Sequence, residues 1–173
     1  MFFSSIYQRV SRLYRPACLL FLFSSISLLA LAQTNLSFHL LSGYLLSPDA
    51  KINKGKATLF VFQEADTFAD TFKPATTTSK RPELPNFKRD MVIGIATPAT
   101  SKPPRLSVSR VFVQDSTLTV RYIRLADTTK QTQTSVVQPT LVFSIPKQSV
   151  LRARLIENGK LIQTIKQTES ATN

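Results

Sequence analysis

The sequence predicts a mainly β domain, an antiparallel β-sandwich or open barrel of about seven or eight strands with one short helix. Three observations predict this fold class. Short runs rich in β-branched and aromatic residues recur along the chain, turn-forming segments separate them, and a single segment has helical spacing. In the sandwich we expect the helix at one end or edge. The alternative is an α+β arrangement in which the helix packs on a face of the sheet.

The first predicted elements lie between residues 34 and 72. Thr34–Leu46 begins with alternating polar and apolar residues, which is the period of a strand. Thr58–Phe62 has no polar face and predicts a buried strand. Gln63–Phe72 carries Phe68 and Phe72 four residues apart, the spacing of one helix face, and its acidic residues suit a helix N-terminus. We therefore expect strand, strand and helix in this order.

The rest of the chain predicts strands alone, joined by polar or proline-rich loops. These strands are expected over Met91–Ala96, Leu106–Val113, Leu118–Leu125, Val136–Ile145, Val150–Ile156 and Leu161–Lys166. Residues 97–105 contain three prolines, which predicts a loop or an edge rather than a central strand. Asn158-Gly159 separates the last two strands, and Asn-Gly is the strongest short hairpin signal because both central residues of a type I′ turn need positive φ.

Residues 1–32 have the three zones of a secretory signal peptide. Three arginines precede an apolar run from Cys18 to Leu29, and the small-x-small motif Ala30-Leu31-Ala32 follows. A membrane anchor is the alternative, but the run is shorter than the ~20 residues that a spanning helix needs. We expect cleavage, a periplasmic or secreted bacterial protein, and no transmembrane segment in the mature chain. The mature chain, residues 33–173, is then one mainly β domain.

Composition excludes several kinds of chemistry. The predicted leader holds three arginines and no acid, so its removal lowers the formal net charge from +12 to +9. The only cysteine, Cys18, leaves with it, which excludes disulfides, redox motifs, cysteine nucleophiles and cysteine-containing zinc sites in the mature chain. Four glycines in the whole chain are too few for a phosphate-cradling loop. No cofactor is indicated.

The sequence also predicts that the protein is not an enzyme. His39 is the only histidine, and no G-x-S-x-G motif accompanies it, so we interpret it as an ordinary strand residue rather than a triad member. The acids Glu64, Asp66 and Asp70 are candidates for metal ligands or a carboxylate pair. Their position early in the predicted helix favours a solvated face with a favourable dipole placement instead.

Basic residues offer one candidate site. Arg121 and Arg124 lie on a predicted hairpin, and Arg152 and Arg154 share a strand face because alternate residues do. Such a basic face attracts anionic glycans or lipid headgroups; an ordinary solvated surface is the other interpretation. Nucleic acid is not expected, since the chain is exported and aromatic residues are not interleaved with these arginines.

Residues 58–147 carry a series of motifs in a recognisable order. A strand and a short aromatic-bearing helix lead to Leu84-Pro85-Asn86-Phe87, the buried strand Met91–Ile95 follows, and a late strand ends in Ile145-Pro146-Lys147. This series resembles the C-terminal domain of the PrcB family, named for a subunit of a bacterial surface protease complex. The family's Thr-Gly-Gly-Tyr turn is replaced here by residues 97–102. The resemblance implies a small, exported, non-catalytic protein with a partner.

Two functions remain open. The first is a non-enzymatic exported module that binds a protein partner, for which the resemblance implies an extracytoplasmic protease. Loops on a rigid β scaffold usually carry recognition, and the predicted contact residues lie in the proline-rich loop: Thr97, Pro98, Ser101, Lys102, Pro103 and Arg105. The alternative is an envelope module that binds anionic glycan or lipid headgroups through the basic face. We expect salt to weaken the second interaction more than the first.

Overall fold

A computed structural model describes residues 33–75, 82–126 and 134–167. The predicted signal peptide, residues 1–32, lies outside the described residues. The described part is a mainly β sandwich with a single short helix, which confirms the predicted fold class. It contains seven strands of five to ten residues and four of only two or three.

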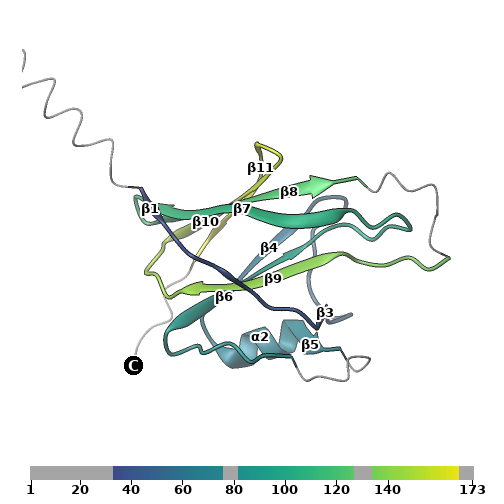
Figure 1. Cartoon of the computed structure of the whole chain (residues 1–173), viewed down its shortest axis with the longest axis horizontal. Coiled ribbons are helices and arrows are strands. Elements are labelled where there is room, and N and C mark those ends of the chain that lie inside the picture. Colours follow the sequence, from purple (N-terminus) through teal and green to yellow (C-terminus); the bar gives the residue numbers. More distant parts are fainter. Residues whose placement is uncertain (1–32, 76–81, 127–133, 168–173) are drawn as a thin grey trace, which may run out of the picture. The chain divides into compact units, whose positions relative to one another are not determined.

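The strands form three sheets, which Figure 1 shows as successive layers with the helix. The five-stranded sheet has the order β1 (Thr34–Asn35), β7 (Arg105–Gln114), β8 (Thr117–Leu125), β10 (Arg152–Glu157) and β11 (Lys160–Lys166). The four-stranded sheet has the order β2 (His39–Leu40), β9 (Thr140–Pro146), β6 (Asp90–Ala96) and β4 (Thr58–Phe62). The third sheet pairs β3 (Tyr44–Leu46) with β5 (Phe72–Pro74), directly after helix α2 (Ala65–Thr71).

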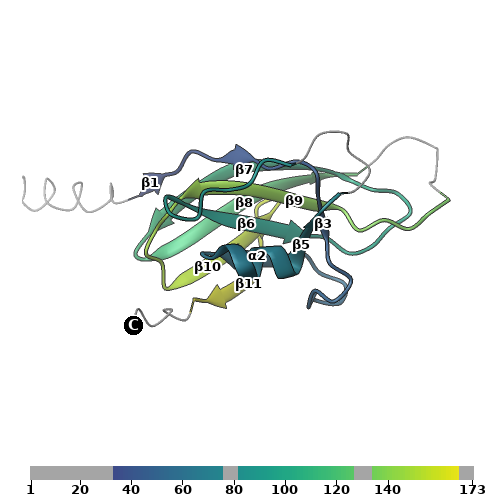
Figure 2. The ribbon, with the colours of Figure 1, turned by 90° about the horizontal axis from the view of Figure 1, so that it is seen from below.

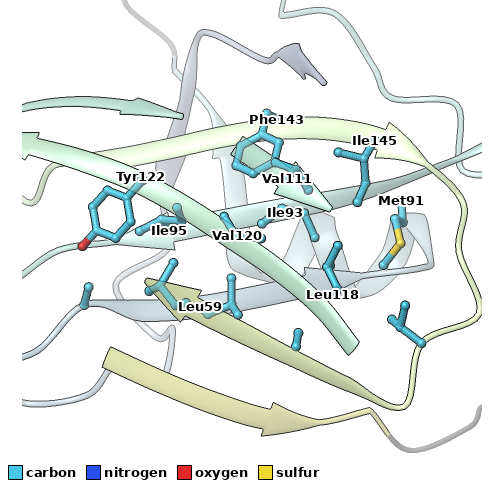
Figure 3. Packing of buried hydrophobic residues seen from close by; sticks show 14 residues of the cluster. Leu59, Met91, Ile93, Ile95, Val111, Leu118, Val120, Tyr122, Phe143 and Ile145 are labelled. Atoms are coloured by element: carbon cyan, nitrogen blue, oxygen red, sulfur yellow. The ribbon is translucent and has the colours of Figure 1, made fainter. Parts of the chain in front are cut away.

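The main core lies between the five-stranded and four-stranded sheets (Figure 3). Alternation along each strand sends every second side chain into this space. The five-stranded sheet contributes Val111, Leu118, Val120, Tyr122, Ala153 and Leu155, and the four-stranded sheet contributes Leu59, Met91, Ile93, Ile95, Phe143 and Ile145. Each large side chain buried here stabilises the fold by about 1.5–3 kcal/mol. This core holds the two sheets rigidly enough for their outer faces to present side chains.

A second, aromatic core covers the other face of the four-stranded sheet. Figure 2 shows α2 alongside β6, and its residue Phe68 packs with Phe72 of β5 against Val92 of β6 and Val142 of β9. The expected position of the helix at an end or edge of the sandwich is therefore wrong: α2 lies on the outer face of a sheet. This placement explains why β6 has no polar face, since both of its faces are covered.

The N-terminal segment differs from the prediction. Thr34–Leu46 is not one strand but three short ones that pair in turn with β7, β9 and β5. Gly43 has φ +82°, a value that glycine adopts without strain, just before β3. The segment crosses from one sheet to the next. Its alternation of polar and apolar residues therefore reflects packing at three successive sheet edges, and not pairing with one strand along its whole length.

Both predicted hairpins are confirmed. β10 and β11 join through Asn158 and Gly159, whose φ values are +47° and +85°, and β7 and β8 join through Asp115 and Ser116, also at positive φ. The sequence did not predict that β10 pairs with β8 in parallel, the one parallel pair among the described strands. Because β9 belongs to the other sheet, the chain crosses the sandwich before β10 returns beside β8.

Candidate functional site

The outer face of the five-stranded sheet carries a group of basic side chains. Val111, Val120, Ala153 and Leu155 point into the core, so their strand neighbours point outward. We call the exposed side chains that result the arginine face: Arg110 of β7, Arg121 of β8, and Arg152 and Arg154 of β10. Lys166 of β11 pairs with Arg152 and extends this face. Four arginines from three strands, with Lys166 from a fourth strand, thus share one surface.

The strand register arranges these residues diagonally across the sheet. Arg110 lies opposite Arg121, Thr119 lies between Phe112 and Arg154, and Thr117 lies between Gln114 and Arg152. Neighbouring strands are about 4.8 Å apart, and same-face residues along a strand are about 6.7 Å apart. The positive charges therefore extend diagonally over three neighbouring rows of paired residues. Arg110 and Arg121 lie in the first row, Arg154 in the second and Arg152 in the third.

Phe112 organises one end of the arginine face. The guanidinium carbons of Arg110 and Arg121 lie 5.3 and 5.5 Å from the centre of its ring. They cover the ring so well that Phe112 is only 7% exposed, although it lies on the outer side of the sheet. Arg110 Nε also donates a hydrogen bond to Asn35 Oδ1 at 2.8 Å. Cation–π contacts of this kind contribute about 0.5–1 kcal/mol each, so the two guanidinium groups are held in place before any ligand arrives.

A hollow of about 410 Å³ opens in the middle of this face. Its lining combines guanidinium groups with hydroxyl, amide and apolar side chains: Phe112, Gln114, Asp115, Thr117, Thr119, Arg121, Arg152, Arg154 and Ile156. Asp115, in the turn between β7 and β8, is the one acid in that lining. The hollow thus offers many donors and few negative charges, the composition of a site for an anionic ligand.

Arg124 does not belong to this face, although we predicted it with the other arginines. Three positions separate it from Arg121, so strand alternation puts it on the opposite side of β8. There Arg124 Nη1 lies 3.6 Å from Glu157 Oε1. The Asn158 side chain bonds both the backbone N–H and the carbonyl oxygen of Arg124 at 3.0 Å. Arg124 therefore helps to fasten the β10–β11 turn to β8.

Glu157 also accepts a hydrogen bond from the hydroxyl of Tyr122, next to Arg124 on β8. Burial, with the hydrogen bond and the negative charge of Glu157, raises the pKa of the Tyr122 hydroxyl above its ordinary value of 10. The hydroxyl therefore stays protonated and donating through the physiological pH range. This cluster connects β8 to the end of β10 and to the β10–β11 turn.

Arg110 is a site residue that sequence reasoning missed. Leu106 and Val108 point into the core, and an uninterrupted strand would send Arg110 inward as well. A register shift between Val108 and Arg110 turns Arg110 outward, opposite Arg121. The sequence does carry a signal of this shift, because the apolar residues of the strand change from even-numbered positions, Leu106 and Val108, to odd-numbered ones, Val111 and Val113.

The proline-rich loop is anchored more firmly than a free contact loop. Thr97 is 1% exposed, and its N–H and hydroxyl both donate to the carbonyl oxygen of Pro139, at 3.0 and 3.1 Å. Thr100 forms an isolated bridge with Val137. Of the predicted contact residues, Lys102 and Arg105 are exposed, whereas Pro98, Ser101 and Pro103 are half-buried. The buried side chain of Thr97 shapes the loop and is not accessible to a partner.

The residues considered for catalysis or metal binding lie apart. His39 is exposed on β2, where its Nε2 is 3.2 Å from Glu83 Oε2. Glu64 precedes α2, and Asp66 and Asp70 lie on exposed positions of that helix. Within residues 33–75, 82–126 and 134–167, no three His, Cys, Asp or Glu side chains are grouped as metal ligands.

Comparison with known proteins found no match among family models, curated proteins or solved structures. The PrcB resemblance therefore stays an expectation that rests on the motifs of residues 58–147. No helix of the described part is long and apolar enough to cross a membrane. The candidate site has to be judged on its own geometry, and the arginine face is the strongest feature of that geometry.

Proposed function

We propose that the protein is an exported, non-enzymatic binding module that holds anionic groups of an envelope constituent on its arginine face. One observation carries this proposal. Three guanidinium groups, those of Arg121, Arg152 and Arg154, line a hollow on one sheet face, and Arg121 is held over Phe112 together with Arg110. Planar guanidinium groups bind phosphate, sulfate and carboxylate through paired hydrogen bonds, so this arrangement suits an oxyanion.

The energetics of the face support a role beyond solubility. Arg110 lies directly opposite Arg121, and like charges in that position destabilise a sheet. No described acidic side chain lies within ion-pair distance of any of the four arginines. By contrast, Arg124 on the other side of β8 has Glu157 as a partner. A bound anion would relieve the repulsion that the protein leaves uncompensated on the arginine face.

The test removes charge from the face and measures binding to two anionic surfaces. The variant carries Arg121→Gln, Arg152→Gln and Arg154→Gln, which keep polar side chains on exposed strand positions. Binding of the mature protein is measured against an acidic polysaccharide and against vesicles that contain phosphatidylglycerol. We expect at least a tenfold loss of affinity for one of these ligands, and a steep weakening of wild-type binding as salt rises.

A charge-matched control separates a site from bulk attraction. Lys51, Lys54 and Lys88 are exposed cations outside the five-stranded sheet, and their replacement by Gln removes the same total charge. Long-range attraction depends on the whole charge distribution, whereas a site depends on local groups. Affinity within about twofold of wild type supports the site. Equal losses in the two variants would mean that net charge alone causes binding, and the proposal would be wrong.

A protein partner is the second candidate, and the anchored loop favours it. Thr97 and Thr100 tie the loop that precedes β7 to residues 137–139, so the exposed Lys102 lies in a preformed loop and the exposed Arg105 begins β7 directly after it. A preformed loop loses less entropy on binding. Crosslinking of the tagged protein in its native envelope, followed by mass spectrometry, tests this function. Reproducible capture of one protein, lost in a Lys102→Glu/Arg105→Glu variant, supports it, and capture of envelope polymer alone opposes it.

A further inference from the structure

We infer that the ligand of the arginine face is an acidic glycan chain, a polymer whose sugars carry both anionic groups and free hydroxyls. This inference rests on the proposed function and narrows it. It depends on three features of the hollow: the position of Thr119, the mixture of side chains in the lining, and the distance over which the charges extend.

Thr119 provides the main observation. Its side chain lies on the outer side of β8, between Phe112 and Arg154 in register, and lines the hollow. The residue is only 6% exposed. Its hydroxyl forms no hydrogen bond with a described group and is not a buried unpaired atom, so it is accessible from the hollow. An accessible hydroxyl can bind water and can exchange that water for a ligand group. A group of the ligand that enters the hollow would find this hydroxyl among the guanidinium groups.

The other polar residues of the hollow offer acceptors as well as donors. Arginine side chains only donate hydrogen bonds, and they satisfy phosphate or carboxylate oxygens. Gln114 and Thr117 add an amide oxygen and a hydroxyl, which accept hydrogen bonds from a ligand O–H. Ile156 supplies an apolar patch beside them. Sugars present hydroxyls and C–H surfaces together, so this lining fits an acidic sugar better than a bare polyanion.

The shape of the face distinguishes a glycan chain from a lipid surface. Phe112 and Thr119 lie deep in the hollow, since they are 7% and 6% exposed, whereas the surrounding arginines are exposed. A flat array of headgroups would contact the rim and leave the floor empty. A chain can descend into the hollow and place one sugar against Thr119.

The extent of the positive charge sets a minimum length for the ligand. Arg121 and Thr117 are four residues apart on β8, and Arg152 lies beside Thr117. Four strand residues span about 13 Å, so the charges at the two ends of the diagonal are separated by more than one sugar. We therefore expect affinity to rise with chain length up to a few sugars and then to level off.

The experiment compares ligands that differ in hydroxyls and in length. Polygalacturonate oligomers carry carboxylates and hydroxyls, dextran sulfate oligomers carry sulfates and hydroxyls, and polyphosphate carries charge alone. Thr119→Val keeps the branched shape and removes the hydroxyl; Thr164→Val is the matched control, since Thr164 lies opposite Arg154 on β11 but does not line the hollow. The loss of one hydrogen bond lowers affinity about fivefold.

We expect Thr119→Val to lower the affinity for at least one glycan about fivefold relative to polyphosphate, and Thr164→Val to leave that ratio unaltered. Thermal unfolding and circular dichroism of each variant establish that it is folded. If the triple arginine variant loses binding but Thr119→Val keeps the wild-type ratio, the glycan inference is wrong and the anion-binding function survives. If neither glycan binds, or if phosphatidylglycerol vesicles bind more tightly than both, the glycan inference is wrong as well.

Discussion

Replacement of Gly94 by alanine should destabilise the domain, because the methyl group has no room. A β-carbon at this position would lie 2.6 Å from Cε2 and 2.8 Å from Cζ of Phe72. Carbon atoms in contact are normally about 3.5–4.0 Å apart. Phe72 is fully buried and its ring lies 5.9 Å from the ring of Phe60 and 5.8 Å from that of Phe68, so it has no free direction in which to move. Overpacking of such a core costs about 1–3 kcal/mol.

The assay is urea unfolding of the mature domain, followed by circular dichroism and fluorescence. The slope of unfolding free energy against urea is about 1–3 kcal/mol per molar for small proteins, so a loss of 2 kcal/mol lowers the midpoint by about 1 M. Ser107→Ala is the control, since Ser107 is exposed on β7 and such changes stay within about 0.5 kcal/mol. If the slope is the same in the variant and in wild type, the lower midpoint reflects a loss of unfolding free energy from the native packing.

A double variant tests whether the Phe72 ring causes this loss of stability. Phe72→Leu removes ring atoms that Gly94→Ala would strike, so the two changes together should cost less than the sum of the single changes. The expected coupling is more than about 0.5 kcal/mol in favour of the double variant. A Gly94→Ala midpoint equal to that of wild type, or strictly additive losses, would mean that Phe72 does not pack against Gly94 as described.

Three further outcomes follow from contacts elsewhere in the sandwich. Burial and Glu157 raise the pKa of Tyr122 in the folded state. The contribution of this group to the unfolding free energy is therefore fully present below pH ~10 and declines above it, because unfolded chains then lose the proton that folded chains keep. Tyr122→Phe should reduce that decline when the unfolding free energy is measured against pH. Thr97→Val should lower the unfolding free energy by about 1 kcal/mol in urea, because the hydroxyl bond to Pro139 is lost. Gly159→Ala, at φ +85°, should cost about 1–2 kcal/mol in the same assay, and no loss would contradict the left-handed turn.

Local sequence patterns predicted much of the sandwich. The β10–β11 hairpin follows from Asn158-Gly159, and the buried strand β6 follows from a run without polar residues. The prediction of one strand over Thr34–Leu46 was wrong, because alternation indicates a strand but does not show which strand it pairs with. Phe38 and Leu40 are 39% and 53% exposed, so the apolar period did not mark one buried face. Partner choice depends on contacts distant in sequence, and the same limit hid the parallel pairing of β8 with β10.

The candidate site was predicted in part, for similar reasons. Alternation alone placed Arg152 and Arg154 on one face. The same rule separates Arg121 from Arg124, which are three positions apart, so that error was avoidable from the sequence. Arg110 could be assigned to this face only from the register shift in β7, which changes the side of the sheet that even-numbered residues face. The position of the Thr119 hydroxyl in the hollow could not be predicted, because Phe112 and residues of the two neighbouring strands form the hollow around it.

The parallel pairing of β8 with β10 has a consequence for how the protein matures. The arginine face needs Arg152 and Arg154 beside β8, and these residues come more than thirty positions after Thr117 and Thr119, their partners in the sheet. Contacts between residues so distant in the chain form slowly, after local hairpins. A chain that ends before residue 150 would retain Arg110 and Arg121 but lack half of the face. Ligand binding would therefore report that synthesis and folding have reached completion.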